Sequence, residues 1–111
     1  MIEIEAVLEE NGTLRACKAS GHAQAGKSGE DIVCAAVSVL IRTACNILSG
    51  KEGIVLRCDA PEKGHVWLEA DYEADGKDFL HTAGVFLIEG LSSVAREYPK
   101  NCKLNIVIRR N

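Results

Sequence analysis

A cysteine and a histidine in the first third of the chain, Cys34 and His22, could together carry out nucleophilic chemistry. A thiolate attacks the carbonyl carbon of an amide, and a nearby imidazole takes up the thiol proton and later returns it to the leaving group. The apolar run after Asp31 predicts a buried helix with Cys34 in its first turn. Unpaired backbone amides and the helix dipole at such a position favour the thiolate. His22 lies upstream, in a segment that could fold back toward the sulfur.

Cys34 also has a purely structural interpretation. Its sequence neighbours, residues 32–37, are apolar, and a cysteine in such a run commonly fills a hydrophobic core. The residues alone leave both interpretations open.

Residues 21–28 also match the phosphate-binding pattern GxxxxGK[ST], in which backbone amides surround a phosphate. The preceding residues 14–19 are too polar for the buried central strand that such a loop follows. Glu30 and Asp31 would place negative charge beside the phosphates. We therefore interpret the pattern as a chance match and expect no nucleotide or other cofactor.

Residues 20–38 closely resemble the signature of the ribosomal-processing cysteine proteases, the Prp family. The resemblance rests on Ser-Gly-His-Ala at 20–23, on Gly26, and on Gly-Glu-Asp-Ile-Val-Cys-Ala-Ala-Val-Ser at 29–38. It implies a bacterial cytosolic endopeptidase that removes a short N-terminal extension from a large-subunit ribosomal protein, number twenty-seven of that subunit. It also implies a peptide substrate and a homodimer, with Cys34 as the nucleophile and His22 as the general base.

Two further residues of the signature have supporting roles under this resemblance. Asp31 either caps the helix or orients the imidazolium of His22. Ser38 lies one turn beyond Cys34 on the same side, where it touches substrate or satisfies the backbone behind it. Backbone amides near Cys34 are expected to form the oxyanion hole, because the first amides of a helix lack internal partners.

The segment that carries His22 is expected to be a mobile lid. Its hinges are expected at three glycines, Gly21, Gly26 and Gly29. Peptide binding should order this lid, bring the imidazole within hydrogen-bond reach of Cys34 and exclude water.

Hydrophobic periodicity predicts one α+β domain over residues 1–111, in the order β-β-α-β-β-α-β. Asn11-Gly12 and the residues from Pro61 to Gly64 predict the turns of two hairpins, and Pro99 ends the second helix. The expected architecture is a mostly antiparallel sheet of about five strands with both helices packed against it. The elements are expected near residues 2–8, 13–19, 31–48, 54–58, 65–70, 80–98 and 104–108.

Composition narrows the classes of protein that the sequence can encode. The chain has 13 basic and 16 acidic residues and a net charge of −3, unlike a basic nucleic-acid-binding surface. Residues 1–5 alternate apolar and acidic types, unlike a signal peptide, and the apolar run 32–41 is shorter than the ~20 residues of a membrane-spanning helix. Five cysteines without a CxxC pair fit neither a disulfide framework nor a zinc ribbon. We therefore expect a cytoplasmic protein with reduced thiols and no contact with a membrane.

Other conspicuous residues have more than one interpretation. His65 and His81 share no ligand spacing with a cysteine, so we expect no metal site. Trp67 either packs against a helix or lies at an interface. The acidic residues from Glu69 to Asp78 form a solvated turn or attract a lysine-rich ribosomal substrate. For the whole protein, the alternative to a protease is a ribosome-associated binding module in which Cys34 is inert core.

Overall fold

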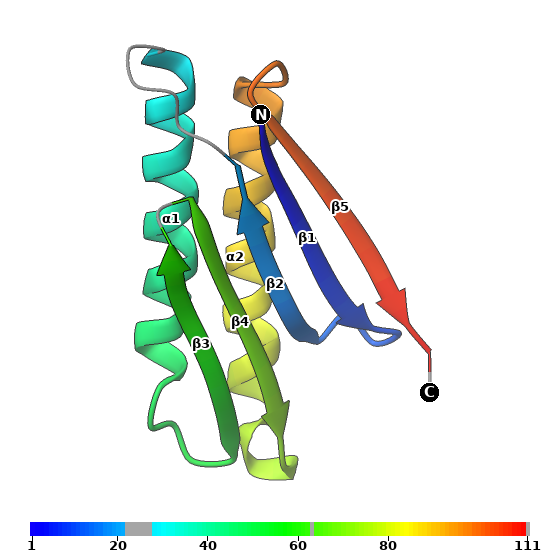
Figure 1. The fold of residues 1–111 in the computed structure, drawn as a ribbon. Helices are drawn as coiled ribbons and strands as arrows, with labels where there is room; N and C mark the ends of the chain where they lie inside the picture. Colours follow the sequence, from blue (N-terminus) through cyan, green and yellow to red (C-terminus); the bar gives the residue numbers. More distant parts are fainter. Residues whose placement is uncertain (22–27, 63, 111) are drawn as a thin grey trace.

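The computed structural model describes residues 1–21, 28–62 and 64–110, and over these residues it contains a five-stranded sheet and two long helices (Figure 1). The predicted α+β class and element order are confirmed. The strands are β1 (Ile2–Glu9), β2 (Leu14–Ser20), β3 (Ile54–Glu62), β4 (His65–Tyr72) and β5 (Cys102–Arg109). The helices are α1 (Ser28–Leu48) and α2 (Lys77–Glu97), with a short 3-10 turn at Ala74–Gly76 before α2.

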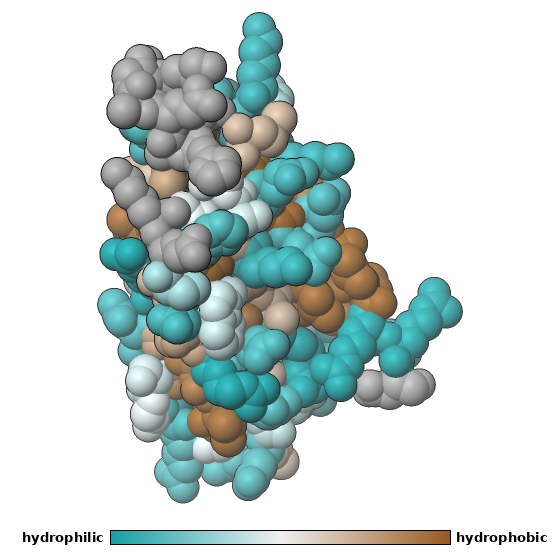
Figure 2. Space-filling model, viewed as in Figure 1, coloured by the Kyte–Doolittle hydropathy of each residue, from teal (hydrophilic) through white to brown (hydrophobic). Residues whose placement is uncertain are grey.

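The strands lie in the order β3-β4-β2-β1-β5, so β3 and β5 form the two edges of the sheet. β5 pairs in parallel with β1, and the other neighbouring strands described here pair antiparallel, which confirms a mostly antiparallel sheet. Both helices cover one face of the sheet (Figure 1). The opposite face, which Figure 2 shows, is largely hydrophilic apart from an apolar area on the β1–β5 side.

The core lies between the sheet and the helices, because strand alternation and helical spacing direct apolar side chains into this layer. Ile4 of β1 and Val33 and Ile41 of α1 are almost completely buried there. α2 approaches β2 so closely that a Cβ atom on Gly84 would lie 2.7 Å from Cβ of Leu14. A glycine at this position therefore allows α2 to pack directly on the sheet.

Three predicted boundaries were wrong by three residues or more, including the start of α2, which lies at Lys77 and not near residue 80. α1 begins at Ser28, three residues before the expected start at Asp31. β3 continues through Pro61 to Glu62, where a turn from Pro61 to Gly64 was expected, and its pairing with β4 shifts register between Asp59 and Glu62. Proline lacks the amide of a central ladder, but an edge strand such as β3 tolerates it, especially at an irregularity.

α1 is more apolar than the run 32–41 suggested. Its residues Asp31–Leu48 have a mean hydropathy of 1.7 and are, by length and composition, long and apolar enough to cross a membrane. The length of the shorter run therefore does not by itself exclude a membrane-spanning helix. A core helix of a folded domain passes the same test, and α1 contributes Val33, Val37 and Ile41 to the core.

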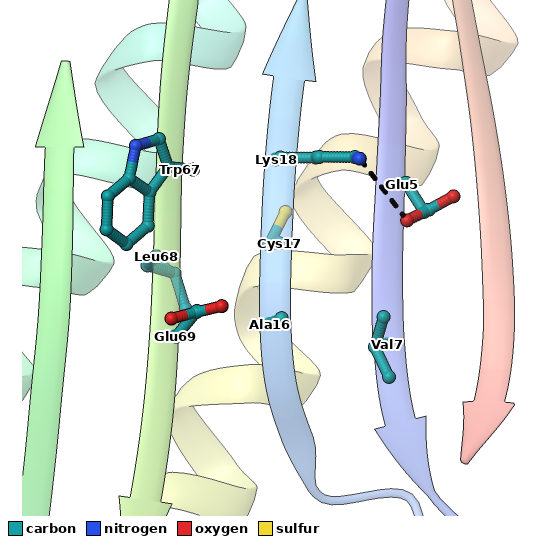
Figure 3. Close-up of a pocket in the computed structure, with 8 residues that line it drawn as sticks. All are labelled: Glu5, Val7, Ala16, Cys17, Lys18, Trp67, Leu68 and Glu69. Atoms are coloured by element: carbon teal, nitrogen blue, oxygen red, sulfur yellow. Dashed lines mark ion pairs between the residues drawn. The ribbon is translucent and has the colours of Figure 1, made fainter. Parts of the chain in front are cut away.

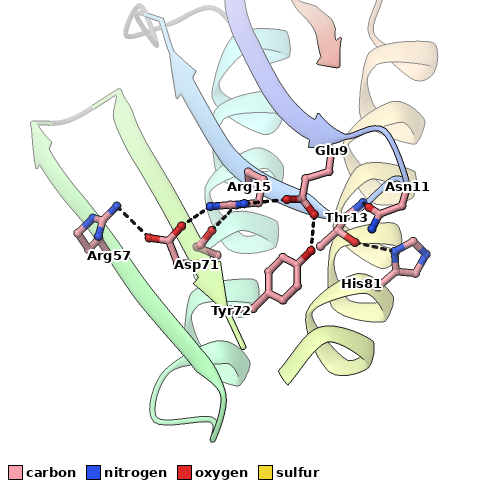
Figure 4. A network of polar contacts seen from close by, with 9 residues as sticks. Glu9, Asn11, Thr13, Arg15, Arg57, Asp71, Tyr72 and His81 are labelled. Carbon is pink, nitrogen blue, oxygen red and sulfur yellow. Dashed lines mark hydrogen bonds and ion pairs between the residues drawn. The ribbon is translucent and has the colours of Figure 1, made fainter. Parts of the chain in front are cut away.

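A polar network joins three strands at the end of the sheet where β1 turns into β2 (Figure 4). Arg15 donates hydrogen bonds to Glu9 at 2.8 Å and to the carbonyl oxygen of Ala70 at 2.8 Å, and it also pairs with Asp71. Tyr72 donates a hydrogen bond to Glu9. The hydrogen bond from Tyr72, aided by Arg15, lowers the pKa of the Glu9 carboxyl although burial opposes ionisation. Part of the acidic segment from Glu69 to Asp78 is thus paired within the fold.

Candidate active site

Cys34 lies on the side of α1 that faces the sheet and is half-buried. It lines a narrow crevice of about 10 Å³ near the end of the sheet where β1 and β4 begin and β2 ends. A space of this size is at the lower limit of what one water molecule needs. The crevice is lined by Ile2, Ala19, Cys34, Val37, Ser38, Gly64 and Val66.

Because α1 begins earlier than predicted, Cys34 lies farther from the start of the helix than expected. Cys34 comes six residues after Ser28, so it lies in the second turn and not in the predicted first turn. The amides without an intrahelical acceptor belong to the first four residues, Ser28 to Asp31, about 5–9 Å earlier along the axis. Dipole effects fall off within the first turn. The prediction that Cys34 lies in the first turn, beside unpaired helical amides, is therefore wrong, and the position of the oxyanion hole stays a prediction.

The crevice that Cys34 lines includes Ser38 but not Asp31. Ser38, one turn beyond Cys34, is half-buried and lines the same crevice. Asp31 is exposed and is the fourth residue of α1, so it is not the N-cap residue. The carboxylate of Asp31 still lies in the first turn, where it complements the helix dipole.

His22 and Gly26 lie outside the described residues, and Gly29 belongs to the first turn of α1. The described chain reaches Gly21, the residue before His22, at a close backbone contact with the β3–β4 turn. The amide of Gly21 donates a hydrogen bond to the carbonyl oxygen of Gly64 at 3.1 Å, and a Cβ atom on Gly64 would lie 2.3 Å from the carbonyl oxygen of Gly21. Because Gly64 lines the Cys34 crevice, the chain runs toward His22 from a point beside the thiol site. Whether the three glycines act as hinges stays a prediction.

The four other cysteines differ from Cys34 in their surroundings, and all five are free thiols. Burial raises the pKa of Cys17 to about 12. Burial also raises the pKa of Cys45 to about 12, with a further contribution from a hydrogen bond with Cys58. Cys102 is buried and its pKa is raised for the same reason, whereas Cys58 is exposed. Three of the five thiols are therefore neutral at physiological pH.

A larger hollow lies on the opposite face of the sheet, which separates it from Cys34. It measures about 290 Å³, and Trp67 and Val7 line it together with the Lys18–Glu5 ion pair of 3.8 Å (Figure 3). Its position shows that Trp67 lies on the open face and does not pack against a helix.

No group of three side chains suited to hold a metal lies together in residues 1–21, 28–62 and 64–110.

Sequence reasoning did not find the residues that complete the crevice. Ile2, Ala19, Gly64 and Val66 come from three strands and a turn that only the folded sheet brings to α1. For Gly64 the sequence did contain an indication of a turn, because a glycine in a hairpin turn often has a positive φ. The φ of Gly64 is +90°. That signal indicates the turn but not its contact with Gly21.

Solved structures share this fold. SMU.848 from Streptococcus mutans is 25% identical with a TM-score of 0.80, over 98% of this chain and 96% of that chain. An essential ribosomal processing protease Prp from S. aureus, in complex with a substrate peptide, is 22% identical with a TM-score of 0.79, over 96% of this chain and 99% of that chain. A structure of the same protease with a covalently linked product peptide gives 23% identity and a TM-score of 0.78, over 96% and 99% of the two chains. Among curated proteins, none matches the chain.

The protein is a cysteine protease, because the sequence model of a family described as Cysteine protease Prp matches residues 1–103. This match covers nearly the whole chain. The chain therefore belongs to the Prp family. This membership favours a protease over the non-catalytic binding module.

Proposed function

We propose that this protein is an endopeptidase that removes the N-terminal extension of a large-subunit ribosomal protein, number twenty-seven of that subunit. The observation that carries the proposal is the position of Cys34, which lines a crevice with Ser38 beside the point where the chain runs toward His22. The S. aureus relatives, one with a substrate peptide and one with a covalently linked product peptide, support a peptide as the class of substrate.

In the proposed first half of the reaction, the imidazole of His22 accepts the proton of the Cys34 thiol. The thiolate attacks the carbonyl carbon of the scissile amide, and negative charge moves to the carbonyl oxygen. The imidazolium then protonates the leaving amine, the C–N bond breaks, and a thioester with Cys34 remains. Because Cys34 lies beyond the first turn of α1, we expect thiolate formation to depend chiefly on His22.

In the second half, His22 acts as the base toward water, which attacks the thioester carbonyl. The C–S bond breaks, the carboxylic acid leaves, and the thiol of Cys34 is restored. Ser38 lies where it can contact the substrate during both halves. Asp31 can assist by orienting the imidazolium or by stabilising the helix start, and comparing Asp31→Asn with wild type in kcat and in unfolding separates these roles.

The proposal is tested by incubating the protein with the ribosomal protein of the same organism and measuring product masses. We expect one cut near the N-terminus of the substrate by the wild type and none by Cys34→Ala. Thr43→Ala serves as the matched control, since Thr43 is exposed on the same helix away from the crevice. An uncut substrate, or equal cutting by Cys34→Ala, would contradict the proposed function.

We further propose that the protein acts in the cytoplasm as a homodimer. Five free thiols support a reducing compartment. The edge strand β5 supports self-association, because Ile106, Val107 and Ile108 are 46%, 44% and 49% exposed beside an unpaired backbone edge. Sedimentation of the wild type should give a dimer mass, and Val107→Lys should shift it toward the monomer. A monomeric wild type at micromolar concentration would contradict the dimer.

A further inference from the structure

A second cavity adjoins the Cys34 crevice along α1. The two spaces share one wall, the side chain of Val66 on β4. The second cavity measures about 260 Å³ and lies where α1 runs beside the β3–β4 hairpin (Figure 1). We call it the α1–β3 cavity, and its lining consists of Arg42, Cys45, Asn46, Cys58, Asp59, Ala60 and Val66.

The spacing of residues on α1 relates this cavity to the nucleophile. Cys34, Ser38 and Arg42 follow one another at intervals of four and so lie along one side of the helix. From Cys34 to Arg42 the helix rises about 12 Å, and an extended peptide covers this distance in three to four residues at ~3.3 Å each. A peptide cleaved at Cys34 that follows α1 would therefore place a side chain three or four residues from the scissile bond in the cavity.

The residues that line the α1–β3 cavity determine which kind of substrate side chain it can accept. The buried residues Cys45 and Val66 give it an apolar floor, to which the exposed Ala60 adds an apolar side chain, and burial keeps the Cys45 thiol uncharged at neutral pH. Arg42 and Asp59 are exposed at its rim, and Arg42 forms no ion pair within the described parts of the chain. A volume of about 260 Å³ is slightly below the ~300–1,000 Å³ of typical small-molecule sites. The cavity thus fits one large side chain better than a complete small ligand.

We propose that the α1–β3 cavity is a substrate subsite, which accepts a bulky apolar side chain three or four residues from the bond that Cys34 cleaves. This inference rests on the proposed peptidase function. It assigns a specificity-determining role to Ala60 and Val66, which lie outside the signature of residues 20–38. Arg42 lies at the rim, where it can donate hydrogen bonds to the peptide carbonyls on either side of the bound side chain.

The test fills the cavity with Ala60→Phe and compares it with Val55→Phe. Val55 is a suitable control because it is 58% exposed on the same edge strand and does not line the cavity. Each variant is assayed on a cleavable peptide with a bulky apolar residue three or four positions from the scissile bond, and on the same peptide with glycine there. We expect Ala60→Phe to raise KM at least tenfold on the first peptide, with kcat within twofold of wild type, and to have no effect on the glycine peptide. Val55→Phe should leave both peptides unaffected.

The wild-type enzyme provides a second, independent test of the subsite. Replacing the bulky residue by glycine at one of these positions should lower its kcat/KM at least tenfold. Equal wild-type cleavage of both peptides would overturn the subsite while leaving the peptidase function intact, as would an Ala60→Phe enzyme that behaves like Val55→Phe. If the wild type cleaves no peptide, the proposed function itself is wrong. If Ala60→Phe does not fold, Ala60→Leu replaces it with the same expectations.

Discussion

The contact between Gly64 and Gly21 makes a quantitative prediction about turnover. Gly64 has a φ of +90°, so Gly64→Ala should cost about 1–2 kcal/mol of folding free energy through backbone strain. Its Cβ atom would lie 2.3 Å from the carbonyl oxygen of Gly21, and must move by at least 0.7 Å to reach 3.0 Å. A displacement of about 1 Å in a catalytic group can lower the rate 10²-fold. We therefore expect Gly64→Ala to lower kcat about 10- to 100-fold.

Gly50→Ala provides the matched control for this prediction. Gly50 also has a positive φ, +73°, but a Cβ atom there would meet no other atom within 4 Å. The two variants should therefore lose similar amounts of stability through backbone strain, while Gly50→Ala keeps the kcat of the wild type. The measurements are initial rates of peptide cleavage and urea unfolding of both variants. A kcat for Gly64→Ala within twofold of that for Gly50→Ala would refute the idea that this contact positions the catalytic segment.

Cys34→Ala should abolish cleavage and leave the urea midpoint nearly unchanged, since alanine suits a helix; wild-type rates in this variant would exclude Cys34 as the nucleophile. His22→Ala should lower kcat by about two to four orders of magnitude and change the pH–rate profile, and an unaltered profile would contradict its role as the base. Glu9→Gln should destabilise the protein by about 1–3 kcal/mol at pH 7, because it replaces the charged carboxylate that accepts the hydrogen bond of the Tyr72 hydroxyl by an uncharged amide. Since folding lowers the pKa of Glu9, this difference should persist above the unfolded pKa of about 4.5 and vanish as the pH falls through the folded pKa. Urea titrations at several pH values, with Glu10→Gln as the control, check this; a difference that grows on acidification would show the reasoning to be wrong.

Local patterns predicted most elements of this fold because each element faces a single buried layer. The alternation of Ile2, Ile4 and Ala6 with polar residues was sufficient for β1, since β1 buries one side only. The start of α1 was missed because Gly29 and its charged neighbours lack apolar periodicity. Acidic residues there are favourable in the first turn of a helix, so a signal for the earlier start was present in the sequence.

Long-range pairing could not be predicted in the same way. No local property of residues 102–109 indicates that β5 pairs in parallel with β1, or that β3 is an edge strand that tolerates Pro61. For the site, helical spacing alone placed Ser38 beside Cys34. The contribution of Gly64 depended on the pairing of β3 with β4 and was found only in the folded sheet.

The polar network around Arg15 has a consequence for how the molecule fluctuates. The network joins β1, β2 and β4 at the end of the sheet away from the Cys34 crevice. At the crevice, the described residues contact one another through apolar side chains and through backbone hydrogen bonds, such as those from Gly21 to Gly64 and from Ile2 to Asn101. Local opening requires less free energy where fewer directional interactions must break. Amide protons around Gly64 should therefore exchange with solvent through small, local openings, whereas those around Arg15 exchange only when the sheet unfolds as a whole. We expect the end with the Cys34 crevice to loosen when a peptide binds, while the opposite end preserves the register of the strands.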